Sequence, residues 1–125
     1  MGDYIMSTIK ANDIQNASGG IPTVKGQRLI PTAWVNFNGT GTVAINDDEN
    51  VSSVTDLGGL GQYQINFTTA MANANYCPLL STDYDLDNSP FISHITTTSY
   101  RVLMYTGSAY RDVSGVYTAV LGGQA

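Results

Sequence analysis

Apolar and polar side chains alternate in two short segments of this chain. Residues 33–38 alternate alanine, valine and phenylalanine with tryptophan and asparagine, and residues 62–67 alternate tyrosine, isoleucine and phenylalanine with amide side chains. A repeat of two residues is the period of a strand with one buried face, so both segments predict half-buried strands. Gly39 and Gly41 follow the first segment and predict a tight hairpin in which both adopt positive φ.

Turn residues separate further apolar segments at short intervals from Thr32 onward, and no amphipathic helix competes with them. This spacing is typical of an antiparallel sandwich or jelly roll. The predicted fold class is all-β, a jelly-roll-like antiparallel β-sandwich over residues 32–125. About eight strands are expected, at residues 32–38, 42–46, 51–56, 62–67, 75–80, 91–97, 100–106 and 116–121.

Three of these strands carry irregular patterns. Val51 and Val54 lie three residues apart, which predicts a β-bulge. Pro78 cannot donate a ladder hydrogen bond, which places its strand at a sheet edge or a bulge. The last strand, 116–121, is apolar on both faces, so it is either central in its sheet or buried against another subunit. Val116 and Val120 are therefore candidates for a subunit interface.

Residues 1–31 differ from the rest of the chain. Their apolar side chains are scattered among polar residues and interrupted by Ser18-Gly19-Gly20, so only a short strand at residues 7–10 is expected. Such a segment cannot build its own core and is interpreted as an extended arm that docks on other proteins. The apolar residues expected to dock are Ile5, Ile9, Ile14, Ile21 and Val24.

The charge composition of the chain argues against some classes of function. Charged residues make up 12% of the chain, against about 25% in average globular proteins, and the net charge is −5. A scarcity of basic residues argues against nucleic-acid binding, which rests on clustered lysine and arginine. The first residues lack the pattern of a signal peptide, and no apolar run is long enough to span a membrane, so we expect synthesis in a cytoplasm without membrane insertion. Cys77, the single cysteine, is expected to be a small core residue.

Acidic residues cluster in two places. Asp83, Asp85 and Asp87 alternate in a predicted loop, and oxygen ligands of this kind suit Ca²⁺. Asn88 stands where a calcium loop needs glycine, and His94 stands where it needs a bidentate glutamate. We therefore expect a solvated acidic loop and no metal or other cofactor. The second cluster, residues 47–49, is interpreted as a charged hairpin tip.

No catalytic motif emerges from the sequence. His94 is the only histidine, and no nucleophile elbow or glycine-rich phosphate loop accompanies it. It is interpreted as a polar or half-buried strand residue. An enzymatic function is not expected.

The eight tyrosines and one leucine-containing turn supply candidate contact residues. Tyrosine joins a rigid apolar ring to a hydroxyl, which suits both cores and interfaces. Tyr63, Tyr76 and Tyr117 are assigned to the core, and Tyr84, Tyr110 and the neighbouring Arg111 to an outward contact surface. In the turn 57–61, Leu57 and Leu60 either pack against another subunit or fold back on the core.

Four segments carry a resemblance to a known group of proteins. They are STIKANDIQNASGG at residues 7–20, AWVNFNGTGTVAI at 33–45, NVSSVTD at 50–56 and YQINFTTAM at 63–71. Together they resemble a module of tail-fibre-like virion proteins from tailed bacteriophages, over roughly residues 6–76. The resemblance implies a structural protein of the virion that assembles as a homotrimer.

Two functions follow as expectations. The protein is either a short tail fibre or spike whose head binds a host-surface glycan or protein, or a decoration (cement) protein whose arm and head clamp capsid subunits. A carbohydrate-binding module is a third class with the same fold. The extended arm spans at most about 100 Å, which suits a short spike or a decoration protein.

Overall fold

The computed structural model describes residues 8, 10–20, 22–24, 27–28, 30–83 and 90–124. The chain forms two compact units, Met1–Ile30 and Pro31–Ala125. In the first unit, β1 (Thr23–Val24) and β2 (Gln27–Arg28) pair antiparallel. Of the short strand predicted at residues 7–10, Thr8 and Lys10 are described and neither lies in a strand, whereas Ser7 and Ile9 lie outside the described residues.

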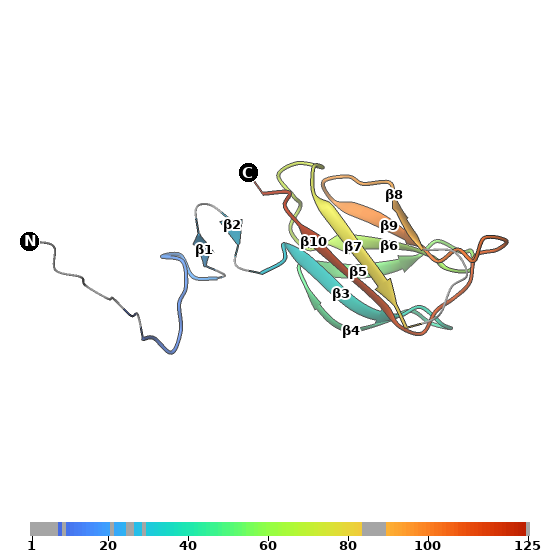
Figure 1. Ribbon diagram of the computed structural model, residues 1–125, viewed down its shortest axis with the longest axis horizontal. Helices are drawn as coiled ribbons and strands as arrows, with labels where there is room; N and C mark the ends of the chain where they lie inside the picture. Colours follow the sequence, from blue (N-terminus) through green and yellow to red (C-terminus); the bar gives the residue numbers. More distant parts are fainter. Residues whose placement is uncertain are drawn as a thin grey trace, which may run out of the picture. The chain divides into compact units, whose positions relative to one another are not determined.

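The second unit is a sandwich of two four-stranded antiparallel sheets, in the orders β4-β3-β10-β7 and β5-β6-β9-β8 (Figure 1). No helix occurs among the described residues. The predicted all-β sandwich is therefore confirmed. The strands are β3 (Ala33–Asn38), β4 (Ala44–Glu49), β5 (Val51–Asp56), β6 (Gln62–Phe67), β7 (Cys77–Thr82), β8 (Phe91–Ser93), β9 (Ser99–Leu103) and β10 (Val116–Leu121).

The alternating strands β3 and β6 supply one inner face each. Ala33, Val35 and Phe37 of β3 are buried, and the residues between them are half-buried. Strand β6 repeats the pattern, with its tyrosine, isoleucine and phenylalanine buried. Because successive side chains point to opposite sides of a strand, the two inner faces meet in one core.

Aromatic rings occupy much of that core. Phe37 of one sheet packs edge-on against Tyr63 of the other, with ring centroids 5.2 Å apart. Phe67, Tyr76 and Tyr100 form a second group with centroid distances of 5.6–6.1 Å. The assignment of Tyr63 and Tyr76 to the core is confirmed. Burial raises the pKa of Tyr76 to about 12 and also raises that of Tyr100.

Strand β10 lies between β3 and β7, which confirms the central position that its two apolar faces allowed. Its register places Val116 and Val120 on the inner face, where both are fully buried within this unit. The prediction that they form a subunit interface is therefore wrong. Tyr117 points to the outer face and is 40% exposed, so its assignment to the core is also wrong. With apolar side chains on both faces, the strand's own pattern could not say which face is inside.

Two local predictions are confirmed. Strands β5 and β6 shift register between Val51 and Ser53, which is the bulge that the valine spacing predicted. Strand β7, which contains Pro78, lies at the edge of its sheet.

Three other placements differ from the sequence-based expectation. Cys77 is exposed at the start of β7 and is not a core residue. Asp47 and Asp48 lie within β4, an edge strand, and do not form a hairpin tip. Charged side chains on an edge strand discourage pairing with another chain, so the cluster still has a solubilising position. His94 is exposed, follows the end of β8 and adopts φ 49°, so it is neither half-buried nor in a strand.

Candidate binding surfaces

The sandwich has two different ends. Because β3 and β10 are antiparallel, the residue that precedes β3 meets the residues that follow β10: the Thr32 hydroxyl donates to the carbonyls of Val120 and Gly122, both at 2.9 Å. At the opposite ends of these strands, Gly39 N donates to Val113 O at 2.9 Å. We call the first the terminal end, since the chain enters and leaves the unit there. The other is the loop end, which carries the loops 39–43, 57–61 and 104–115 (Figure 1).

Buried and partly buried hydrogen bonds join the three loops of the loop end. The Tyr63 hydroxyl lies 2.7 Å from the Gly39 carbonyl and 3.0 Å from an Asp112 carboxylate oxygen. The same carboxylate oxygen accepts the Gly61 N–H at 2.8 Å. Burial and the Asp112 carboxylate raise the pKa of Tyr63, which keeps its donor proton in place. The loop end is therefore a braced surface.

Gly39 shows what this bracing requires of the sequence. A Cβ at this position would overlap the Tyr63 hydroxyl and lie 2.9 Å from the Val113 carbonyl oxygen. Gly41 has φ 62°, whereas Gly39 is not among the residues of positive φ. The prediction of positive φ is therefore correct for Gly41 and wrong for Gly39. Glycine is required at position 39 because the Tyr63 hydroxyl leaves no room for a Cβ.

The loop end brings together residues that the sequence placed in separate sites. Tyr105 and Tyr110 pair across the loop with ring centroids 5.1 Å apart. The turn 57–61 lies against the Arg111 backbone, since a Cβ at Gly61 would meet its nitrogen at 2.8 Å. Leu60 of this turn is 62% exposed, so it does not fold back on the core. Leu57 is 36% exposed.

The loop-end surface, defined by Leu57, Leu60, Tyr105, Tyr110 and Arg111, thus joins two predicted sites. Leucines proposed for a subunit interface share it with Tyr110 and Arg111, which were proposed for receptor contact. Tyr84, the third predicted contact residue, lies outside the described residues.

Asp83 has a structural role at the same end. Its carboxylate accepts the Gly115 N–H at 2.9 Å and the Ser114 hydroxyl at 3.2 Å, which joins the end of β7 to the start of β10. Asp85 and Asp87 lie outside the described residues. Within the described part of the chain, no cluster of acidic, histidine or cysteine side chains is arranged to hold a metal ion.

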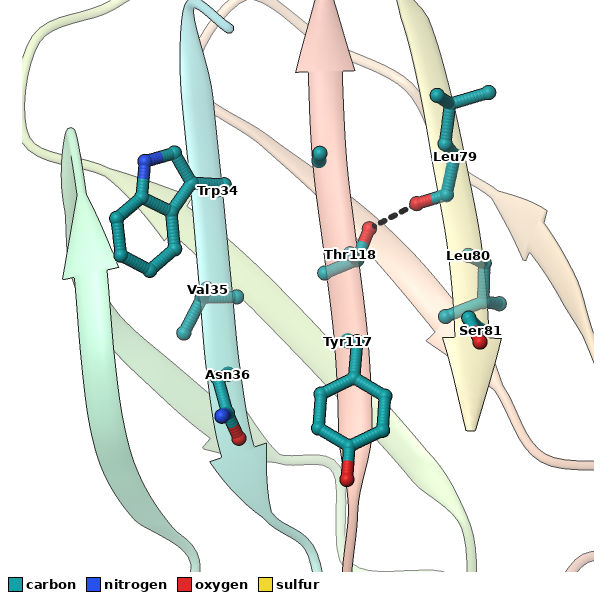
Figure 2. A pocket seen from close by; sticks show the side chains of 9 residues that line it. Trp34, Val35, Asn36, Leu79, Leu80, Ser81, Tyr117 and Thr118 are labelled. Carbon is teal, nitrogen blue, oxygen red and sulfur yellow. Dashed lines mark hydrogen bonds between the residues drawn. The ribbon is translucent and has the colours of Figure 1, made fainter. Parts of the chain in front are cut away.

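A second surface is a shallow groove on the outer face of the sheet β4-β3-β10-β7, with a volume of about 360 Å³ (Figure 2). Its outward side chains come from three adjacent strands: Trp34 and Asn36 of β3, Tyr117 and Ala119 of β10, and Leu79 and Ser81 of β7. We call it the Trp34–Tyr117 groove. The sequence patterns did not lead to a prediction of this groove, although Trp34 at a non-core position of β3 and the second apolar face of β10 indicated apolar residues outside the core.

Most of the side chains that were predicted to dock the arm on other proteins lie outside the described part of the structure. Ile14 is 58% exposed in the first unit. Ile5, Ile9 and Ile21 lie outside the described residues, and the structure gives only the backbone of Val24, in β1.

The described residues contain no helix with the length and apolar character needed to cross a membrane. His94 contacts Ser93, whose hydroxyl oxygen lies 2.9 Å from the imidazole Nδ1, at an exposed position. Comparisons of this chain with protein-family models, with curated proteins and with solved structures found no match.

Proposed function

We propose that this protein is a structural component of a tailed-bacteriophage virion, a short homotrimeric tail fibre or spike. Residues 1–31 dock on other virion proteins, and the loop end of the sandwich contacts a glycan or protein of the host surface. The resemblance of residues 6–76 to tail-fibre-like proteins is one support. The observation that carries the proposal is the separation of the terminal end from a braced loop end within one unit.

This separation matters because the arm joins the sandwich at the terminal end. The loop end lies at the opposite ends of the strands, and we assign the second contact to it. The loop-end surface has suitable side chains for that contact: a tyrosine pair and an exposed arginine. Tyrosine and arginine are enriched among the residues that dominate binding energy at protein interfaces.

A decoration protein of the capsid is the second candidate. Ile14, exposed on the first unit, suits docking to a capsid as well as to a tail. Copy number separates the two functions. Quantitative mass spectrometry of purified particles is expected to give the few dozen copies or fewer of a tail component, and several hundred copies would establish decoration instead.

Removal of the arm is expected to leave a folded head that no longer joins particles. A protein that begins at Pro31 retains both sheets and the whole core, since every strand of the sandwich lies after that residue. The measurements are urea unfolding of the truncated protein and its incorporation into particles that lack the wild-type protein. An unfolded head, or normal incorporation, would contradict the assigned role of the arm.

Leu60→Asp is expected to convert the trimer to smaller species. An exposed leucine gains free energy when a neighbouring subunit covers it, and a carboxylate in its place loses energy by desolvation. Light scattering at micromolar concentration measures the mass. Ser108→Asp, which adds the same charge to an exposed position of the neighbouring loop, is the control and should stay trimeric. If Leu60→Asp remains trimeric but binds host cells less well, Leu60 belongs to the host contact and the predicted interface is wrong.

A further inference from the structure

Two rows of side chains cross the sheet through the Trp34–Tyr117 groove, and each row begins on β4, next to the groove. One row runs Glu49, Trp34, Ala119 and Leu79 over β4, β3, β10 and β7, and the other runs Asp47, Asn36, Tyr117 and Ser81 over the same strands. Ala119 is the smallest side chain of its row, and its position between Trp34 and Leu79 creates the hollow. Each row therefore contains one aromatic ring and has an acidic residue at its β4 end.

Both aromatic rings lie along the sheet with a face turned outward (Figure 2). Trp34 and Tyr117 are diagonal neighbours on adjacent strands, which places their Cα atoms about 7–8 Å apart. Gly115 explains the posture of Tyr117: a Cβ there would lie 2.5 Å from the Tyr117 hydroxyl, so only glycine lets the ring lie down along β10. The platform is thus already formed in the unbound protein.

Neutral hydrogen-bonding groups flank the Tyr117 ring. Asn36 stands opposite it on β3 and Ser81 opposite it on β7. The side-chain Oδ1 of Asn36 accepts a hydrogen bond from the side-chain Nδ2 of Asn46 at 3.1 Å, which orients the Asn36 amide on the sheet surface. An apolar ring face with an amide and a hydroxyl beside it matches a sugar ring, which has an apolar C–H face and a rim of hydroxyl groups.

We propose that the Trp34–Tyr117 groove binds a neutral carbohydrate chain, with one sugar ring stacked on Tyr117 and another against Trp34. Asn36 and Ser81 bind hydroxyls of the first sugar. Asp47 accepts a hydrogen bond from a sugar hydroxyl at the β4 side of the groove. This site is separate from the loop-end surface, and it stands whether or not the protein belongs to a virion.

The acidic ends of the two rows favour a glycan over a second copy of this chain. The rows contain no lysine or arginine, so a copy that covered them with its own matching face would bury Asp47 without a cationic partner from that face. Buried carboxylates without partners are strongly destabilising. The net charge of −5 adds repulsion between copies and disfavours an anionic glycan.

Trp34 is the only tryptophan, so its fluorescence reports on the groove directly. The full-length protein is screened on an array of linear neutral and acidic oligosaccharides of glucose, galactose, mannose and N-acetylglucosamine. The oligosaccharide that binds best is then titrated against Trp34 emission. We expect a saturable change of emission with a neutral oligosaccharide. Tyr117→Ala should weaken binding about fivefold or more, because a lost stacking contact of about 1 kcal/mol corresponds to that factor.

Two variants make the result specific. Tyr117→Phe keeps the ring and should bind like the wild type, and Tyr110→Ala removes a tyrosine from the loop end and should leave the titration unchanged. Urea unfolding confirms that each variant is folded. The proposal is overturned if no oligosaccharide changes Trp34 emission, or if Tyr117→Ala binds as well as the wild type. It is also overturned if Trp34 is shielded from acrylamide in an oligomer that Tyr117→Ala dissociates, because the groove is then a subunit interface.

Discussion

Gly61→Ala is expected to destabilise the sandwich by about 3 kcal/mol or more, by two separate effects. Gly61 has φ +63°, a conformation that strains any residue with a side chain. An added Cβ would also overlap the Arg111 carbonyl oxygen and lie 2.8 Å from both the Arg111 nitrogen and the Met104 carbonyl oxygen. These neighbours are backbone atoms, so they cannot move aside as the end of a flexible side chain can.

The hydrogen bonds of Gly61 connect it to other loops, so a displacement of Gly61 would disturb contacts across the loop end. Its carbonyl accepts the Met104 N–H at 2.7 Å, and its N–H donates to Asp112, which also contacts Tyr63. A shift of the turn that makes room for a methyl group therefore strains several contacts at once.

Gly58→Ala is the matched control, because Gly58 belongs to the same turn and has φ +82° with no atom within 4 Å of an added Cβ. The free energy of unfolding should fall only by the cost of alanine in a left-handed backbone conformation, about 1 kcal/mol. Urea unfolding midpoints at unchanged m-value measure both variants. Equal losses in the two would show that the close backbone approach at Gly61 contributes nothing.

Tyr100→Ala is expected to reduce the free energy of unfolding by about 3–5 kcal/mol, the usual range for emptying a large aromatic site in a core. Tyr100 is fully buried on β9, and its ring lies 5.7 Å from that of Phe67 and 6.1 Å from that of Tyr76. Its hydroxyl and that of Thr118 are 2.9 Å apart, which links the two sheets. Alanine would leave a cavity between them.

Tyr117→Ala is the control for this prediction, since it makes the same chemical change on the outer face, where the ring is 40% exposed. It should cost about 1 kcal/mol or less. Tyr100→Phe separates the ring from the hydroxyl: it leaves Thr118 bonded to the Leu79 carbonyl at 2.7 Å and should cost about 1 kcal/mol. A loss as small for Tyr100→Ala as for Tyr117→Ala would mean that the sandwich core is not packed as described.

The two proposed surfaces make different demands on the fold. The loop-end surface depends on bridging contacts between loops, so variants such as Gly61→Ala should impair it together with stability. The Trp34–Tyr117 groove lies on paired strands, whose register holds its side chains in rows. Substitutions in the groove should therefore change binding with little effect on stability.

The local pattern of the sequence determined those elements in which one face is apolar and the other polar. Strand β6 was predicted with the bounds that the structure has, and the inner face of β3 was predicted correctly, because alternation with amides leaves only one face to bury. The bulge at Val51 and the edge position of Pro78 were predictable for a similar reason, since each follows from a backbone constraint within one strand.

Only the tertiary structure decided where both faces were apolar or where distant segments meet. Strand β10 has apolar residues on each side, and its pairing with β3 and β7 selected Val116 and Val120 for the core and left Tyr117 outside. The Trp34–Tyr117 groove depends on three strands that become neighbours only after folding. The predictions for Cys77 and Gly39 were wrong because both environments depend on residues far away in the sequence. The position of β7 in its sheet leaves Cys77 exposed, and the approach of Tyr63 sets the space around Gly39.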